Sequence, residues 1–342
     1  MAVNQIEAMK ASFTFLIILC SYIAEAQLTI TPGGSLHLTG NAQLTLQNMS
    51  FVNNGSFFPD SGTVLFTGNK DQSIGGTQTI SFFDLIIDMQ HPKMVSLLSP
   101  ISVGKRIYFE NGYLFAGNYD VNLGRTAILQ NEFENQRLWT DGTGRVIATR
   151  NIDNVINALP GNMGLSITID KNLGDVIVRR GYLSPGGGGL PSSALRYYEI
   201  VPEFKPANPG MTLRLKYWDN ELNGVDENNL QVFHSPDGAI WNNLGFSARS
   251  TTNDWVERDD VQLFGRYALA FSTGALPVIF ASIQGRCEGG KTIISWQTAQ
   301  EQNSLHFDIQ RQEMGVWKTI GTVFSAGNSN ALRSYSFADT DP

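Results

Sequence analysis

The sequence predicts an all-β protein built from several modules. Apolar and polar residues alternate along many short segments with a period of about two, the spacing of a strand that buries one face. Turn residues interrupt these segments at short intervals, and 34 glycines supply the backbone freedom that tight corners demand. Helical spacing is not sustained in the N-terminal region, so we expect short strands joined by tight turns.

Residues 1–26 are predicted to be a secretory signal peptide. Lys10 precedes an apolar run over residues 13–23, and Ala24 and Ala26 place small residues before the cleavage site. The run is shorter than the roughly 20 apolar residues that a membrane-spanning helix needs. Cleavage after Ala26 releases a chain that is secreted or held at the outer cell surface; a lipid-modified Cys20 is the alternative.

Composition narrows the classes of partner. The net charge of −7 argues against nucleic acid, because proteins that bind it present basic patches. Charged residues make up 16% of the chain, against about 25% in an ordinary domain, so uncharged polar residues must supply much of the surface. Since Cys20 leaves with the signal peptide, Cys287 remains alone, and we expect no disulfide within the mature chain.

Residues 27–158 are predicted to form a β-solenoid-like repeat region. Leu44 and Leu46 alternate with Thr45, and the same alternation recurs around Val64 and Phe66. The units are loosely similar and have no strict period. Short, regular strands of this kind favour a solenoid, in which each turn stacks on the last. An antiparallel sandwich is the alternative architecture for this region.

Residues 159–274 have a different texture and are predicted to form an antiparallel β-sandwich. Their strands are longer, as in the segments LSITIDKNLGDVIVRRGY and MTLRLKYW. Leu213 and Leu215 alternate with polar neighbours, which fits sheets that each have one solvated face. Pro-Gly steps and a glycine run mark the connecting loops.

Residues 275–342 contain five strand candidates: Val278–Ile283, Lys291–Trp296, Phe307–Gln312, Trp317–Val323 and Ser334–Phe337. A seven-strand sandwich of the immunoglobulin type needs about 100 residues, which is more than this segment supplies. We therefore expect an incomplete sandwich, and we expect the natural protein to continue past Pro342 with about two more strands.

Several segments carry a resemblance to known proteins. The second region contains, in order, LGDVIVRRG, LRYYEIVPE and MTLRLKYWDNELNGVDENNLQVFHSPDGAIWNNLG, and the third contains LPV followed by ISWQTAQEQNSLHFDIQR. These resemble a sandwich module and the fibronectin-type-III-like module that follows it in large secreted and surface proteins of the Bacteroidota. The first region is similar to their adhesin-like β-solenoid turns. The resemblance implies export by type IX secretion, whose sorting domain usually follows these modules.

Residues able to carry catalysis do not cluster in the sequence. The histidines have no metal-ligand spacing, and neither a G-x-S-x-G elbow nor a phosphate-binding G-x-x-x-x-G-K motif occurs. Asp259 and Asp260 are adjacent, so on a strand they point to opposite faces instead of flanking a substrate. We therefore predict no enzyme activity, no catalytic residues, no cofactor and no metal site. The four histidines are His37, His91, His234 and His306.

Two features leave alternatives open. An acidic loop offers several carboxylates that could bind calcium, but its spacing differs from that of an EF-hand, and a polar turn is the favoured interpretation. Paired and single aromatic residues of the second region could stack on sugars, whereas core packing is their commoner role. The carboxylates are those of Asp219, Glu221, Asp226 and Glu227; the aromatic residues are Tyr197, Tyr198, Tyr217, Trp218, Trp241 and Trp255.

The sequence therefore predicts a non-catalytic secreted or cell-surface protein that acts in adhesion or binds an extracellular glycan, matrix component or cell-surface ligand. During export it also meets the secretion machinery. The alternative is an accessory, carbohydrate-binding portion of a secreted polysaccharide-degrading enzyme.

Overall fold

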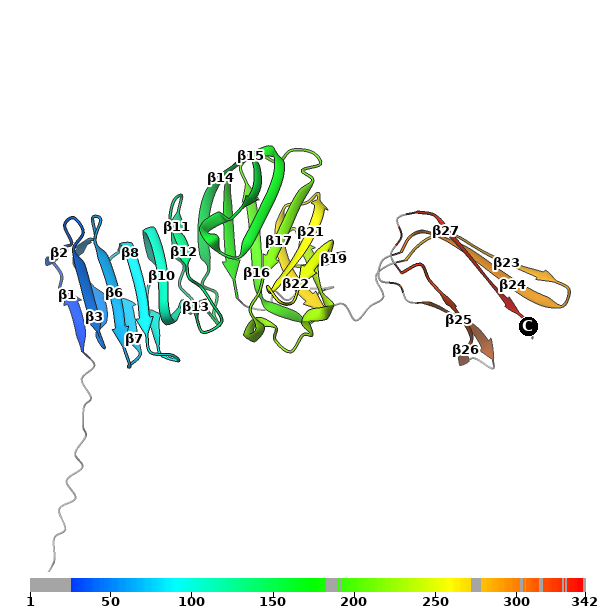
Figure 1. Cartoon of the computed structure of the whole chain (residues 1–342), viewed down its shortest axis with the longest axis horizontal. Coiled ribbons are helices and arrows are strands. Elements are labelled where there is room, and N and C mark those ends of the chain that lie inside the picture. Colours follow the sequence, from blue (N-terminus) through cyan, green and yellow to red (C-terminus); the bar gives the residue numbers. More distant parts are fainter. Residues whose placement is uncertain are drawn as a thin grey trace, which may run out of the picture.

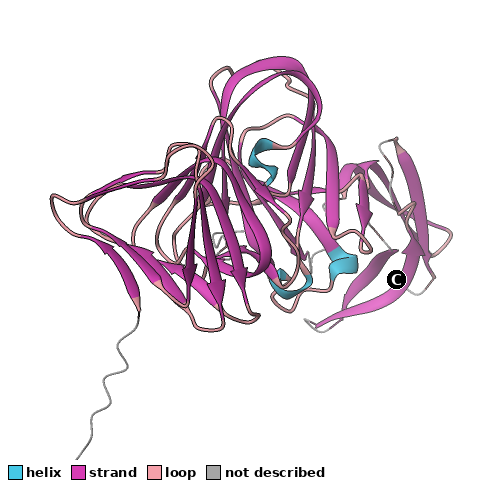
Figure 2. Cartoon of the chain, turned by 60° about the vertical axis from the view of Figure 1, so that its left-hand side comes forward, coloured by secondary structure: helices cyan, strands magenta, loops and turns pink. Residues whose placement is uncertain are grey.

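The computed structural model describes residues 26–182, 190, 192–271, 278–301, 304, 306–313, 316–327, 329 and 331–340. Within these ranges the regular elements are strands, apart from three one-turn 3-10 helices (Figure 2). These helices are η1 (Pro160–Asn162), η2 (Asp219–Glu221) and η3 (Glu227–Asn229). The predicted all-β class is confirmed. None of the helices in the described ranges is long and apolar enough to span a bilayer.

The N-terminal part is a β-solenoid of about six turns (Figure 1). One face is a parallel stack of four strands: β3 (Gln43–Gln47), β6 (Thr63–Gly68), β8 (Ile80–Met89) and the first part of β10 (Ile101–Phe115). A second face stacks, also in parallel, β1 (Gln27–Ile30), β4 (Ser50–Asn53), β7 (Gln72–Gly75), β9 (Met94–Leu97), the end of β10 and β13 (Gln136–Trp139). The solenoid prediction is confirmed, and the antiparallel alternative is wrong for these strands.

Short strands complete the turns of the solenoid. β2 (Ser35–His37) pairs in parallel with β5 (Ser56–Phe58) at its N-terminal end. At the other end, β11 (Val121–Gly124) and β12 (Ile128–Gln130) pair in parallel with β10. The apolar residues of successive turns lie in register, as in the series Leu44, Val64, Leu85, Ile107 and Leu129, and form the core.

Asparagines at the corners explain why the sequence repeat has no strict period. The side-chain carbonyl of Asn48 accepts a hydrogen bond from the backbone N–H of Asn69, 21 positions later. The corresponding bond from Thr77 to Asn54 spans 23 positions, and that from Thr143 to Asn118 spans 25. These three corners are tied to the next turn by the same kind of interaction, but the number of residues that it spans varies. The alternation within strands is kept while the period drifts.

The alternation of buried and exposed residues gives a direct test. Leu46 is 1% exposed in the core, whereas Thr45 is exposed to solvent. Leu46→Ala should lower the free energy of unfolding by about 2–5 kcal/mol, because it removes buried apolar surface and leaves a cavity. Thr45→Ala should change it by less than about 0.5 kcal/mol. Urea denaturation measures both; equal effects at the two positions would contradict the assigned faces.

A long hairpin joins the solenoid to the antiparallel region. β14 (Val146–Ala158) pairs in parallel with β11 and antiparallel with β15 (Leu165–Gly181). The predicted boundary between residues 158 and 159 therefore falls inside this hairpin. The same hydrophobic core runs without interruption from Ile30 in the solenoid to Leu269 in the antiparallel region.

Two antiparallel branches diverge from β15. One continues through β16 (Ser193–Pro202), β22 (Gly265–Phe271), β18 (Leu230–Ser235) and β19 (Asn242–Gly245). The other continues through β17 (Met211–Lys216), β21 (Trp255–Val261) and β20 (Ala248–Ser250). Leu213 and Leu215 are buried at 0% and 1% exposure, as their alternation predicts.

The C-terminal strands form two small antiparallel sheets, and none of their described residues belongs to that core. β23 (Ile279–Glu288), β24 (Lys291–Gln300) and β27 (Arg333–Asp339) make one sheet; β25 (His306–Glu313) and β26 (Val316–Phe324) make the other. All five predicted strands are present. Trp296 is buried against Phe307 and Tyr335, and Cys287 is an exposed free thiol.

Candidate functional site

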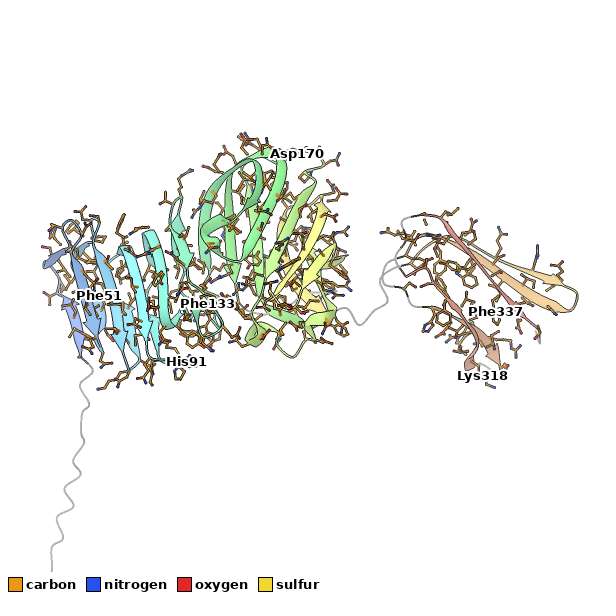
Figure 3. The ribbon with its side chains drawn as sticks, viewed as in Figure 1. Phe51, His91, Phe133, Asp170, Lys318 and Phe337 are labelled. Carbon is orange, nitrogen blue, oxygen red and sulfur yellow. The ribbon has the colours of Figure 1, made fainter. Side chains whose placement is uncertain are left out.

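A pocket of about 470 Å³ lies where the outer surface of the last solenoid turns meets the antiparallel region. Its rings are those of Tyr113, Trp139 and Tyr182, and its polar groups include Arg137 and Glu221. The ring of His91, which Figure 3 labels at the lower edge of the solenoid, contacts the ring of Tyr113, with 5.4 Å between ring centroids. We call this site the aromatic pocket.

The period-two geometry of β10 and β13 builds the aromatic wall of the pocket. Leu114 and Leu138 are neighbours in register and point inward, at 0% and 1% exposure. The residues on either side therefore point outward, where Tyr113 lies beside Arg137 and Phe115 beside Trp139. The Phe115 and Trp139 ring centroids are 4.9 Å apart. The wall is thus fixed by the same strands that fill the core.

A buried network of charges supports the floor of the pocket. The Oε1 atom of Glu221 lies 2.8 Å from Nη2 of Arg196 and 3.5 Å from Nε of Arg137. Its Oε2 accepts a hydrogen bond of 3.2 Å from the backbone N–H of Trp218. Arg137 also donates to the backbone carbonyl of Glu134 and to the side-chain carbonyl of Asn220. Arg137 and Arg196 therefore share the single carboxylate of Glu221, and the terminal nitrogens of Arg137 are held by carbonyl groups.

A second buried pair covers the edge of the last solenoid strand. Both carboxylate oxygens of Glu132 accept hydrogen bonds of 2.8 Å from Arg180, which is 0% exposed. The same two residues also bond to Leu138 in β13. The backbone N–H of Leu138 donates to Glu132 at 3.0 Å, and the backbone carbonyl of Leu138 accepts from Arg180 at 3.4 Å. Burial alone would raise the pKa of Glu132, but the Arg180 guanidinium outweighs it and holds that pKa below its usual value.

The lowered pKa of Glu132 has a consequence for acid stability. An acid whose pKa is lower in the folded state stabilises the fold above its unfolded-state pKa, and this contribution is lost as the pH falls through the folded-state pKa. Glu132→Gln should destabilise the protein at pH 7 by about 3–5 kcal/mol, because Arg180 is left as an unpaired buried charge. The variant should also lose less stability than the parent between pH 7 and acid pH.

Asp71 provides the matched control for this prediction. It forms a surface ion pair with Lys93 at 3.1 Å, with side-chain exposures of 56% and 39%. Asp71→Asn should change stability at pH 7 by less than about 1 kcal/mol. Chemical denaturation at pH 7 and at acid pH measures all three proteins; equal stability of Glu132→Gln and Asp71→Asn would rule out the structural role of Glu132.

The predicted acidic loop is divided by the fold. Glu221 is buried in the charge network, and the carboxylate of Asp226 caps η3 (Glu227–Asn229) by accepting the backbone N–H of Asn228 at 3.0 Å. Asp219 and Glu227 instead meet Asp254, with one oxygen from each residue within 4.8 Å of the others. Asp254 could not be found from the spacing within the loop, because the turn between β20 and β21, distant in sequence, brings it there.

The three neighbouring carboxylates repel one another. The pKa of Asp254 is raised, mainly because the group is partly buried and also because the negative charges of Asp219 and Glu227 lie close to it. A raised acid pKa means that this group opposes folding increasingly as the pH rises through the range between its unfolded and folded values. Carboxylate oxygens are also the ligands that calcium prefers. Calcium binding at this loop therefore stays the alternative to a polar turn.

The calcium prediction is tested by melting temperature with and without the ion. A bound ligand at a hundredfold excess over its Kd adds about 2.7 kcal/mol of stability. Millimolar calcium should raise the melting temperature of the parent and of Asp226→Asn, whose substituted side chain lies outside the trio. It should not raise that of Asp219→Asn. If calcium leaves the parent unchanged, the loop is a polar turn.

Four of the aromatic residues that the sequence singled out pack in the interior. Tyr198, Tyr217, Trp218 and Trp241 are buried at 1%, 1%, 7% and 3% exposure, which confirms the packing interpretation for these four. The histidines lie on separate elements. Burial lowers the pKa of His234, and its Nε2 lies 3.1 Å from the carbonyl of Phe264.

The sequence analysis did not single out the aromatic wall. Its signal is present in the two segments GYLF and RLW, where an aromatic residue alternates with an inward leucine on strands one turn apart. Recognising it required the register between β10 and β13, which the uneven turn lengths conceal.

Comparison with known proteins gave no match: no family model matches the chain, and neither a curated protein nor a solved structure matches it significantly. The interpretation of the aromatic pocket therefore rests on its geometry.

Proposed function

We propose that the protein is a non-catalytic, exported binding protein that acts in adhesion or in the capture of an extracellular glycan, matrix component or cell-surface ligand. The observation that carries this proposal is the aromatic pocket, a concave site with three aromatic residues and a few fixed polar groups. Sites of this composition, held by rigid elements, are typical of ligand recognition.

The chemistry of the pocket supports binding over catalysis. General acid–base catalysis needs a protonatable group that is free to exchange a proton with the substrate. Glu221 is held by Arg196, Arg137 and a backbone N–H, so its oxygens are committed within the protein. Asp141 lines the pocket and is exposed, and the other carboxylate among the lining residues is that of Glu221, whose engaged oxygens leave no free partner for a glycosidase pair.

The proposal also includes the types of the second and third modules, the signal peptide and the route of export. A sandwich for residues 159–274 is supported by the two antiparallel branches, and a fibronectin-type-III-like module for 275–342 by the two C-terminal sheets. The signal peptide of residues 1–26 lies outside the described residues except for Ala26. Export by type IX secretion and a place on a Bacteroidota cell surface rest on the sequence resemblance alone.

Substitution of the pocket rings tests the proposal. Trp139→Ala and Tyr113→Ala should each weaken binding to the ligand found on a glycan and matrix array by about tenfold or more, because stacking surface is lost. Trp317→Ala is the matched control, since Trp317 is 62% exposed on β26 in the C-terminal module. A melting curve for each variant separates lost binding from lost folding.

Two results would count against the proposal. Undiminished capture by folded Trp139→Ala would remove the pocket from the binding site. Cleavage of a polysaccharide by the purified chain would show that the protein is catalytic. The alternative reading, an accessory part of a polysaccharide-degrading enzyme, is favoured if pocket-dependent binding is confined to the polysaccharide that a linked catalytic domain degrades.

A further inference from the structure

We infer that the aromatic pocket takes an uncharged pyranose unit of a polysaccharide and discriminates against the corresponding uronic acid. This inference rests on the proposed function, since it names the class of ligand that the proposed binding site recognises. It is carried by three features of the pocket: its ring surface, the commitment of its guanidinium group, and the free carboxylate at its mouth.

The ring surface matches the apolar face of a sugar. Trp139 is supported from one side by Phe115, at 4.9 Å between ring centroids, and is approached by the edge of Tyr113 at 6.5 Å. These contacts hold the indole in place, so stacking on it costs little side-chain entropy. The pocket volume of about 470 Å³ lies within the range of small-ligand sites and accommodates about one or two sugar rings.

The terminal nitrogens of the guanidinium group that lines the pocket, that of Arg137, are already hydrogen-bonded within the chain. Arg137 donates from its terminal nitrogens to the Glu134 carbonyl and to Asn220, and its Nε lies 3.5 Å from Glu221. Its guanidinium carbon also lies 5.7 Å from the centre of the Tyr113 ring, and the side chain is only 7% exposed. A ligand carboxylate that paired with Arg137 would have to displace these contacts and leave buried groups unsatisfied.

The remaining charge at the mouth favours hydroxyl groups over an anion. Asp141 lines the pocket, is exposed, and forms no hydrogen bond or ion pair within the part of the chain that the structure describes. A carboxylate is an acceptor only, so it can receive hydrogen bonds from two adjacent sugar hydroxyls. The same carboxylate repels a uronate, and the Arg137 guanidinium, whose side chain is 7% exposed, is bonded to partners within the chain.

Thr140 does not compete for this role. Its hydroxyl donates to the Gly117 carbonyl at 2.5 Å and accepts from the backbone N–H of Gly142 at 2.9 Å, so it fixes the loop that carries Asp141. Recognition of hydroxyls is therefore assigned to Asp141, and recognition of the sugar face to Trp139 with Tyr113.

The test uses matched pairs of oligosaccharides that differ only at C6, such as oligogalactosides with oligogalacturonides and oligomannosides with oligomannuronides. Isothermal titration at about 50 mM salt, where charge effects are little screened, compares the two members of each pair. The neutral member of at least one pair should bind about tenfold or more tightly than its uronate. Asp141→Asn should narrow this ratio by improving binding of the uronate, and Trp139→Ala should remove binding of both.

A uronate that binds as tightly as its neutral partner, or more tightly, overturns the inference, and so does a ratio unchanged in Asp141→Asn. If neither neutral sugars nor uronates bind, the glycan and matrix array distinguishes a failure of the sugar assignment from a failure of the proposed function. Capture of a protein or other matrix component that depends on Trp139 would leave the proposed function standing and sink only the sugar assignment. The absence of any Trp139-dependent capture would sink both.

Discussion

The backbone of the last solenoid turn is the constraint on which the rest of the structure depends. A stack of parallel strands ends in an edge whose N–H and C=O groups need partners, and an uncovered edge is a template for aggregation. Here each face of the final turn is covered by a different device. β14 pairs in parallel with β11, and its other side pairs antiparallel with β15. The side chain of Asn162 donates to the backbone carbonyl of Leu129. Glu132 accepts the backbone N–H of Leu138, and Arg180 donates to the carbonyl of Leu138.

The strands that cover the last solenoid turn also determine where the aromatic pocket forms. β14 and β15 carry the chain out of the solenoid, and the segments that follow return to the outside of β10 and β13. Glu221, from η2 (Asp219–Glu221), there approaches Arg137 of β13, and Asn220 accepts a bond from the same arginine across 83 positions of sequence. The aromatic pocket is therefore a product of the junction between two architectures, and neither would form it alone.

Much of the fold is predictable from local pattern, whereas the pocket is not. Alternation places Leu46, Val64 and Leu213 inside correctly, because a strand has only two faces and the choice between them is local. The length of each solenoid turn is set by its corner, so the sequence gives the strands but not their register. The outward-pointing neighbours of Leu114 and Leu138 consequently could not be recognised as one aromatic wall.

The same reasoning explains the acidic loop. Its sequence shows a run of neighbouring acids, but the fold sends Glu221 inward to Arg196, leaves Asp226 as a cap, and recruits Asp254 from another turn. Electrostatic partners are chosen by tertiary contacts that local spacing does not encode. The sequence could therefore indicate that charges gather near this loop, but not which of them would meet.

The most direct test of the account is a crystal structure of the chain with the neutral oligosaccharide that it binds most tightly. The account predicts a sugar ring stacked on Trp139, with two of its hydroxyls donating to Asp141 and with the contacts of Arg137 to Asn220 and Glu221 unchanged. A sugar bound on another face while the aromatic pocket holds only solvent, or an Arg137 that has left Glu221 to pair with the ligand, would contradict it.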